Sequence, residues 1–380
     1  MKITVHSSKS VKPAYSSAAT STDTPAGGTS NLIPLTVFDE VNHDEYVPGI
    51  FAFHPPTPPI AVLEAGLAKM LAEYRHWAGR LVAMHASSGK RAILLNDAGA
   101  RFVEASADIA LDELAPLELT PELLSLHPSC EGVEELMLVQ VTRFTCGSFT
   151  VGYSMHHSPG VRLPVEVKAS AGSRRSKPYS AAQCVVAHLW RCVTMARGLN
   201  MHEVTKLHIA VNGRWGRMRD PTVPNGYTGN AVLWARPSIT VQDLRYMPLG
   251  RVVELISKAV ASVDNGYFRS FVDFASSGAA EQEGLVRTAE SSELVGRTNI
   301  EVDSVLGIPF YELDIGTGKP FLFMPTYSTP RPVEGAAFLV GTPAGDGGVV
   351  AYVPLYRRAV EPFWSCCYSL PPALVGDARL

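Results

Sequence analysis

Alternating apolar and polar residues in the first half of the chain predict a β-hairpin that ends in two histidines. One alternating run occupies residues 135–144, a Cys-Gly turn follows, and a second run occupies residues 148–155. Successive side chains of a strand point to opposite faces, so each run is typical of a half-buried strand. We therefore expect the second strand to carry His156 and His157 at its end.

The remaining periodicity predicts a mixture of strands and helices. Helices are expected over 61–79, from the N-cap Ser180 to Gly198, over 242–265 with a break near Pro248, and over 268–286. Strands are expected at 2–5, 49–53, 91–95, 206–212, 299–303, 309–314, 320–327, 336–340 and 348–353. The order lacks regular βαβ alternation and a Gly-rich nucleotide fingerprint. This pattern favours α+β layers over a Rossmann sheet.

Composition narrows the class of protein. The chain has 380 residues, of which 46% are hydrophobic, enough for two domains with a sizeable core. The net charge is −3 and no long basic run occurs, which argues against nucleic acid or an anionic membrane as a partner. No signal-peptide pattern and no apolar run of membrane-spanning length are found. We expect a soluble cytoplasmic protein.

The cysteines give no pattern of their own. They form neither CxxC pairs nor a spacing typical of metal ligands, and the adjacent pair makes a poor disulfide. We expect reduced, mostly buried thiols and no metal site. The six are Cys130, Cys146, Cys184, Cys192, Cys366 and Cys367.

The histidine pair is the main candidate for chemistry. Histidine has the unperturbed pKa best suited to proton transfer near neutral pH, and a strand end is a stiff mount for it. On spacing alone, a surface or core-packed pair is the commoner interpretation. The other motifs along the chain favour a catalytic role for the pair.

Five stretches in a fixed order carry a resemblance to a known family. They are 74–81, which contains AGRL; 155–157; 183–191; 213–214 with 224–230; and 309–320. In this order they resemble the plant BAHD acyltransferases, which transfer acyl groups from coenzyme A thioesters. Within that family the chain is similar to the grass hydroxycinnamoyltransferases that act on amines such as agmatine, putrescine or tryptamine. The resemblance covers nearly the whole chain.

The resemblance implies an α+β fold of two chloramphenicol-acetyltransferase-like domains, with mixed sheets flanked by helices. The first domain would span residues 1–165 and be truncated, a crossover linker would span 166–178, and the second domain would span 179–380. The segment that the family carries between the histidine motif and the second domain is missing here, which indicates an internal deletion or an altered splice junction.

The resemblance also assigns roles at the histidine pair. His157 would be the general base, with His156 as the alternative if the motif is shifted by one residue. In the family an Asp follows four residues later, but here that position is Val161, or Gly160 for the shifted motif, so no acid is present either way. Arg214 is the candidate partner of the missing Asp.

A second motif is structural in the family. The loop 314–320 keeps Asp314, Gly316 and Gly318 but lacks the Phe and Trp of the family's DFGWGKP. We expect this loop to support the architecture away from the chemistry. The acceptor pocket would be lined from within residues 36–39 and 299–304.

The implied function is transfer of a hydroxycinnamoyl group from a CoA thioester to an amine, a phenolamide-forming reaction of plant secondary metabolism. Acyl-CoA would be a co-substrate, with no permanently bound cofactor, no nucleic acid, no membrane and a monomeric chain. Because the motif Asp is missing, the sequence leaves activity open. The alternatives are a catalytically impaired or dead truncated paralogue that only binds acyl-CoA or a partner, and a product that fails to fold.

Overall fold

The structure is a computed structural model that describes residues 1–15, 31–42, 44–84, 90–114, 120–157, 179–214, 223, 227, 229–285, 298–327 and 334–368. Contacts divide the chain into two compact units, both discontinuous in sequence. Unit 1 is drawn from Met1–Val165, Pro224–Asn230 and Ile308–Arg331, and unit 2 from Glu166–Val223, Ala231–Gly307 and Pro332–Leu380. The division into domains 1–165 and 179–380 with a linker at 166–178 stays a prediction, since residues 158–178 lie outside the described residues.

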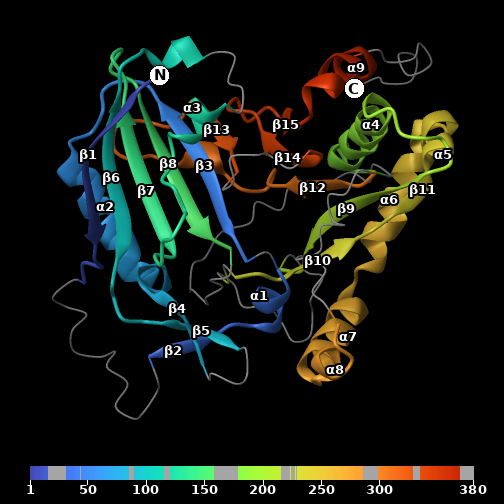
Figure 1. Ribbon diagram of the computed structural model, residues 1–380, viewed down its shortest axis with the longest axis horizontal. Coiled ribbons are helices and arrows are strands. Elements are labelled where there is room, and N and C mark those ends of the chain that lie inside the picture. The colour runs from blue at the N-terminus through green and yellow to red at the C-terminus, as the bar shows by residue number, and fades with distance from the viewer. Residues whose placement is uncertain are drawn as a thin grey trace. The chain divides into compact units, whose positions relative to one another are not determined.

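Unit 1 is built on a six-stranded sheet of order β1-β6-β7-β8-β3-β13 (Figure 1). Its strands are β1 (Ile3–Val11), β3 (Tyr46–Phe53), β6 (Ala100–Ala107), β7 (Met137–Arg143), β8 (Phe149–His156) and β13 (Leu322–Pro325). Only the β6–β7 pair is parallel. A small antiparallel sheet contains β2 (Leu32–Pro34), β4 (Arg80–Ala83) and β5 (Arg91–Leu94).

The register between β3 and β8 fixes the place of the histidine pair. Phe53 lies opposite Phe149 with the two rings stacked at 5.0 Å, and Tyr46 lies opposite His156 at the other end of the pair. A Cβ at Gly152 in the middle of β8 would lie 2.0 Å from the Leu126 carbonyl oxygen, so only glycine permits this approach. The strand that ends at the histidines is therefore held along its length.

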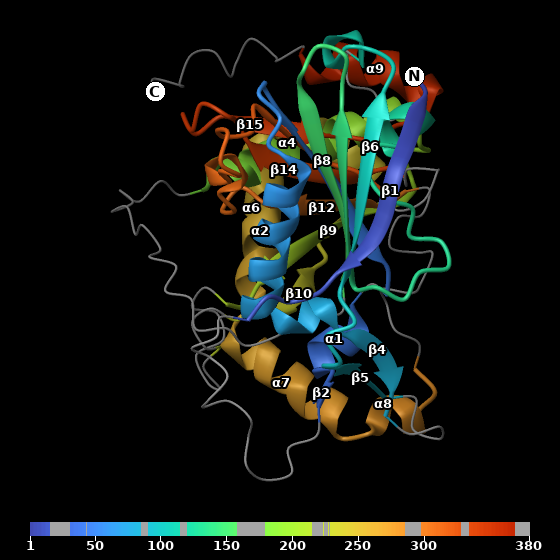
Figure 2. The same ribbon diagram turned by 90° about the vertical axis from the view of Figure 1, so that its left-hand side faces the viewer.

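Helix α2 (Ile60–Glu73) covers the side of the sheet that holds β1 and β6 (Figure 2). Lys9 of β1 forms an ion pair with Glu64 of this helix. The helices of unit 1 are α1 (Val37–Val41), α2 (Ile60–Glu73) and α3 (Pro121–Leu124), with 3₁₀ turns η2 (Arg75–Ala78), η3 (Leu111–Leu114) and η5 (Phe310–Glu312).

Unit 2 is a second mixed sheet packed against helices. The sheet order is β10-β9-β12-β14-β15, with β11 also paired to β9. Its strands are β9 (Val204–Asn212), β10 (Val232–Ala235), β11 (Ser238–Thr240), β12 (Ile300–Ser304), β14 (Ala336–Gly341) and β15 (Val349–Tyr352). The helices are α4 (Ala181–Ala196), α5 (Val241–Tyr246), α6 (Leu249–Ser262), α7 (Asn265–Ser276), α8 (Ala279–Gln282) and α9 (Arg357–Cys367). Trp190 is fully buried in the core and donates to Thr205 Oγ1 at 3.0 Å.

The predicted α+β class is confirmed, and so are the hairpin, the helix capped by Ser180 and the break at Pro248. One prediction in the C-terminal part is wrong and one helix was missed. Residues 309–314 are not a strand but contain the 3₁₀ turn η5 (Phe310–Glu312). No helix was predicted where α9 lies, and α9 contains Pro362, a residue type that usually interrupts a helix. No helix among the described residues has the length and apolar character needed to cross a membrane.

Two buried histidines predict loss of stability in mild acid. Burial lowers the pKa of His76 to about 4, and burial with nearby Arg236 and Lys206 lowers that of His208 to about 4. Between pH 6.5 and 4 the unfolded chain takes up protons that the folded chain excludes, so stability falls as pH falls. His76, which is 1% exposed, contributes a loss of about 3 kcal/mol when fully titrated.

Denaturation across this pH range tests the prediction. His76→Leu should unfold with a shallower pH dependence than the parent chain, because one of the titrating groups is gone. His6→Gln, at an exposed position, is the control and should keep the parent slope. Parallel curves for His76→Leu and the parent would contradict the assignment.

Candidate active site

The backbone of His157 is fixed on both sides of the residue. It directly follows β8, its N–H donates to the Glu45 carbonyl at 2.8 Å, and its own carbonyl accepts from Asn230 Nδ2 at 2.9 Å. One position earlier, the His156 N–H donates to the Leu136 carbonyl at 2.9 Å. The His157 side chain is half-buried. These bonds make the strand end the stiff mount that the sequence predicted.

Asn230 is the residue that ties the histidine to α1. Its side-chain amide is buried and donates both to the His157 carbonyl and to Asp39 Oδ1, the latter at 3.0 Å. Tyr227, three residues earlier, donates from its hydroxyl to the Asn230 carbonyl at 3.3 Å. A single amide group thus joins three segments that lie far apart in the sequence.

Asp39, which accepts from the Asn230 amide, is itself held by Thr36. It is 1% exposed, and its Oδ2 accepts from the Thr36 N–H at 2.9 Å and from the Thr36 hydroxyl at 2.7 Å. Thr36 also accepts from the Asp39 N–H, so the pair forms a capping box at the start of α1. Burial raises the pKa of Asp39, while the hydrogen bonds from Thr36 and Asn230 act in the opposite direction.

Asp39 and Asn230 were not assigned this role from the sequence. Residues 36–39 were expected in the acceptor pocket, whereas the polar atoms of Thr36 and Asp39 bond to each other and to Asn230. Two signals were available: the Thr-x-x-Asp capping pattern and the Pro-Asn-Gly-Tyr-x-Gly-Asn turn that ends at Asn230. Neither reveals that the two ends meet.

His156 has surroundings different from those of His157. Its ring lies edge-on to Tyr46 at 5.0 Å, and its Nε2 is 3.4 Å from Asp44 Oδ1. Burial lowers the pKa of His156, Asp44 raises it and Arg91 lowers it further. Because the His156 ring packs against Tyr46 and Asp44, we assign it a structural role at the end of β8. His157 is therefore the candidate base.

Arg214 follows the end of β9 in unit 2. Its N–H donates to Asn212 Oδ1 at 2.9 Å, and its Nη1 lies 3.5 Å from the same oxygen. Its predicted partner position, Val161, lies outside the described residues, as does Gly160. The role of Arg214 at the missing Asp therefore stays a prediction.

The loop that contains Asp314 is organised by that residue. Asp314 Oδ1 accepts from the N–H groups of Gly316 at 2.8 Å and Gly318 at 3.3 Å, and both glycines have positive φ, of 97° and 114°. Left-handed backbone at both positions explains why glycine stands there.

The sheet register places this loop at the far end from the histidines. The loop enters β13 at Leu322, which pairs with Ala52, and Ala52 pairs with Thr150 of β8. Thr150 lies six residues before His156, about 20 Å along the strand. This placement supports a structural role for Asp314, Gly316 and Gly318.

Comparison with known proteins connects these residues to a family. The Transferase family matches residues 1–159 and 165–369. The chain is 47% identical to agmatine hydroxycinnamoyltransferase 1 of Oryza sativa subsp. japonica, covering 98% of this chain and 99% of that protein. It is 46% identical to agmatine coumaroyltransferase-1 of Hordeum vulgare, covering 97% and 100%. It is 38% identical to putrescine hydroxycinnamoyltransferase 3 of rice, covering 97% and 100%.

The alignments also bear on the predicted deletion. The alignment with the rice agmatine enzyme spans 458 positions, although this chain has only 380 residues, so part of that relative has no counterpart here. The family match is interrupted between residues 159 and 165, directly after the histidine pair. Both findings agree with a deletion behind His157.

Solved structures confirm the expected fold. Vinorine synthase superposes with a TM-score of 0.69 at 19% identity, covering 98% of each chain. The TRI101 protein of F. sporotrichioides, complexed with coenzyme A and T-2, gives a TM-score of 0.67 at 16% identity, covering 88% of this chain and 97% of that one. With the family match over most of the chain and full-length relatives at 46–47% identity, this protein belongs to the Transferase family, the plant BAHD acyltransferases.

Proposed function

We propose that this protein transfers a hydroxycinnamoyl group from a coenzyme A thioester to an amine, with agmatine as the preferred acceptor. The observation that carries the proposal is the identity of 46–47% over essentially full length to two proteins named for agmatine acylation. The fixed backbone at His157 supports it, because the candidate base is held at the end of β8 by Glu45 and Asn230.

The chemistry asks little of the protein beyond a base and orientation. The amine nitrogen attacks the thioester carbonyl carbon, the C–S bond breaks, and coenzyme A leaves as a thiolate. His157 takes the proton from the attacking nitrogen and returns it to the leaving sulfur, so the products are an amide and free CoA. The His157 N–H donates to the Glu45 carbonyl and the His157 carbonyl accepts from Asn230, and such positioning limits the entropy lost when the reactants meet.

The proposal also extends to the co-substrate, the product, the location and the oligomeric state. The acyl-CoA is a co-substrate and the protein holds no permanent cofactor. The product is a phenolamide of plant secondary metabolism, and the chain works as a monomer in the cytoplasm without nucleic acid or membrane partners. Size-exclusion chromatography with light scattering tests the monomer, and a dimer mass would contradict it.

Thiol release from 4-coumaroyl-CoA tests the reaction class. Agmatine, putrescine and the matched alcohol 4-guanidinobutanol are compared as acceptors, with a reaction without acceptor as the control. We expect release to depend on the amine and to be fastest with agmatine, because two relatives that are 46–47% identical to this chain are named for the acylation of agmatine. Equal release with the alcohol, or equal release without acceptor, would contradict the proposal.

A second candidate function is that of an inactive relative that binds acyl-CoA without turnover. The interruption of the family match between residues 159 and 165, where the family Asp would stand, favours it. Calorimetric titration with coumaroyl-CoA separates the two. Binding without amide formation identifies the inactive relative, whereas binding followed by amine-dependent release identifies the enzyme.

A further inference from the structure

Two helices of unit 2 bring one imidazole and three thiols together. The helix α4 carries His188 and Cys192, which are one turn apart and therefore on the same face. The helix α9 ends with Cys366 and Cys367 and packs against α4 (Figure 1). The sequence could not indicate this group, because its two halves are more than 170 residues apart and α9 was not predicted.

The distances within the group are those of a metal site. The ligand atoms of His188, Cys192 and Cys367 all lie within 4.8 Å of one another. Cys192 Sγ is 3.9 Å from His188 Nδ1, and Cys366 Sγ is 3.2 Å from Cys192 Sγ. In a tetrahedral zinc site with ordinary bond lengths, neighbouring N and S ligands are about 3.6 Å apart and two S ligands about 3.8 Å. Cys366 Sγ does not lie within 4.8 Å of all three of these atoms, so the Cys366 side chain has to move to become a fourth ligand.

The second ring nitrogen of His188 is already held as in a metal site. His188 Nε2 lies 2.8 Å from the carbonyl oxygen of Cys367, the hydrogen bond expected if Nε2 carries the proton. That tautomer leaves the lone pair of Nδ1 available to a metal ion, and Cys192 Sγ lies 3.9 Å from Nδ1 and 3.7 Å from Nε2. Metal-binding histidines commonly donate their other N–H to a backbone carbonyl in this way.

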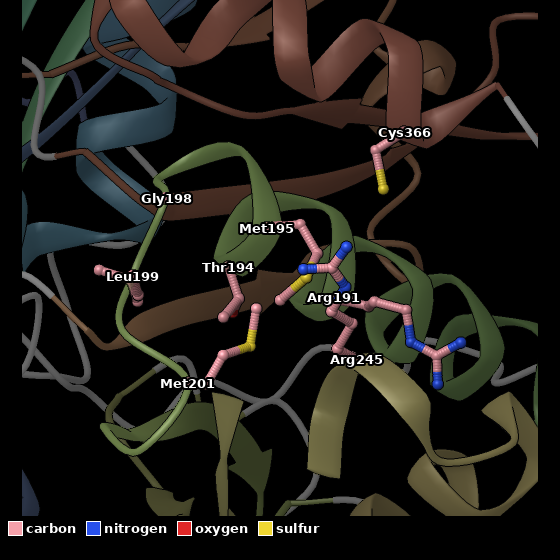
Figure 3. Close-up of a pocket in the computed structure, with 8 residues that line it drawn as sticks. All are labelled: Arg191, Thr194, Met195, Gly198, Leu199, Met201, Arg245 and Cys366. Carbon is pink, nitrogen blue, oxygen red and sulfur yellow. The ribbon is translucent and has the colours of Figure 1, made fainter. Parts of the chain in front are cut away.

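Access and charge also suit a cation bound by thiolates. Cys366 lines a cavity of about 480 Å³ and extends from α9 towards α4, as Figure 3 shows. Arg191 lines the same cavity, and its guanidinium donates to the carbonyls of Leu244 and Met247. Three thiolates around a divalent cation carry one net negative charge, which the nearby guanidinium offsets. Cys192 itself is 1% exposed, so a bound ion would be shielded from water.

We propose that His188, Cys192 and Cys367 bind a thiophilic d¹⁰ cation, zinc above all, with Cys366 as the fourth ligand. Soft thiolates with one imidazole in a tetrahedral arrangement select this class of ion, and four protein ligands make the site structural. Binding replaces the S–H protons, which are released to the buffer. The ion joins the C-terminal helix α9 to α4, and the free energy of binding adds to the stability of unit 2.

Metal titration of the intact, reduced chain tests the site directly. Co²⁺ added to the metal-free protein should give an intense near-ultraviolet thiolate-to-cobalt band that saturates at one equivalent and disappears when Zn²⁺ is added. Zn²⁺ should also raise the melting temperature. The titration needs no variant, so a folding defect cannot obscure it. Absence of the thiolate band with the fully reduced parent chain would overturn the proposal.

Substitutions then assign the ligands. Cys192→Ser and Cys367→Ser should each weaken zinc binding by more than about 100-fold, because loss of a contact that only supports a ligand costs about 10–100-fold. Cys146→Ser and Cys184→Ser are matched controls at exposed thiols outside the group and should bind like the parent. Unchanged zinc affinity in Cys192→Ser and Cys367→Ser would overturn the assignment. The proposal would also be overturned if Cys192 and Cys366 formed a disulfide in air and the reduced protein bound no metal.

Discussion

Replacing His157 with alanine is expected to lower the rate of amide formation by about 10²–10⁴-fold, the usual effect of removing a general base. The side chain stands at the end of β8, and no backbone hydrogen bond of the residue depends on it. The variant should therefore fold and melt like the parent, and the loss should fall on kcat. Steady-state kinetics with coumaroyl-CoA and agmatine, beside a thermal melt, measure both.

His156→Ala is the matched control for that experiment. It removes the neighbouring imidazole, whose contacts are with Tyr46 and Asp44. We expect a smaller loss of activity and a lower melting temperature, because this ring packs against the strand end. If His156→Ala were the inactive variant and His157→Ala the active one, the base would be His156, and the shifted motif would be correct.

Replacing Asn230 with alanine should give the second largest effect. The substitution removes the side-chain amide that donates to the His157 carbonyl and to Asp39 Oδ1, so each acceptor loses one hydrogen bond. The Asp39 carboxylate keeps its bonds from Thr36 and from the Asn230 backbone. A loss of stability of about 1–3 kcal/mol is expected from the unmet hydrogen bonds. A displacement of the histidine by about 1 Å would lower kcat by roughly 10²-fold with little change in KM for either substrate.

A control separates the two consequences. Asn42 is also a buried asparagine beside α1, and its amide donates to the Phe38 carbonyl at 2.7 Å without touching His157. Asn42→Ala should lose comparable stability but keep kcat. If Asn230→Ala and Asn42→Ala lost activity in proportion to their stability alone, Asn230 would have a structural role only and no part in positioning His157.

The sequence predicted what short-range patterns determine. Alternation over residues 135–155 sufficed for the hairpin and for the histidines at its end. The serine cap and amphipathic face sufficed for α4. The ordered motifs sufficed to identify the family, since each motif is a short contiguous stretch of the sequence.

What the sequence could not predict depends on long-range pairing. Asn230 lies 73 residues from His157 and 191 residues from Asp39, so no local pattern reports their meeting. Pro362 concealed α9, and with it the thiols that meet Cys192. The expectation of mostly buried thiols was wrong, because only Cys192 is buried while Cys146 and Cys184 are exposed.

Because the family Asp is absent, the main question is whether His157 is still oriented for catalysis. In this chain the candidate base is held by contacts that do not involve position 161: the Glu45 carbonyl, the Asn230 amide and, behind it, Asp39. If these contacts suffice to orient His157, the protein retains acyl transfer without the Asp. If these contacts do not suffice, the protein binds acyl-CoA without transferring the acyl group.

Mass spectrometry of a reaction containing the purified parent chain, 4-coumaroyl-CoA and agmatine answers that question most directly. We predict that coumaroylagmatine and free CoA form in equal amounts, at a rate well above that of the reaction without protein. A cooperatively melting protein that binds coumaroyl-CoA and forms no amide would contradict the account.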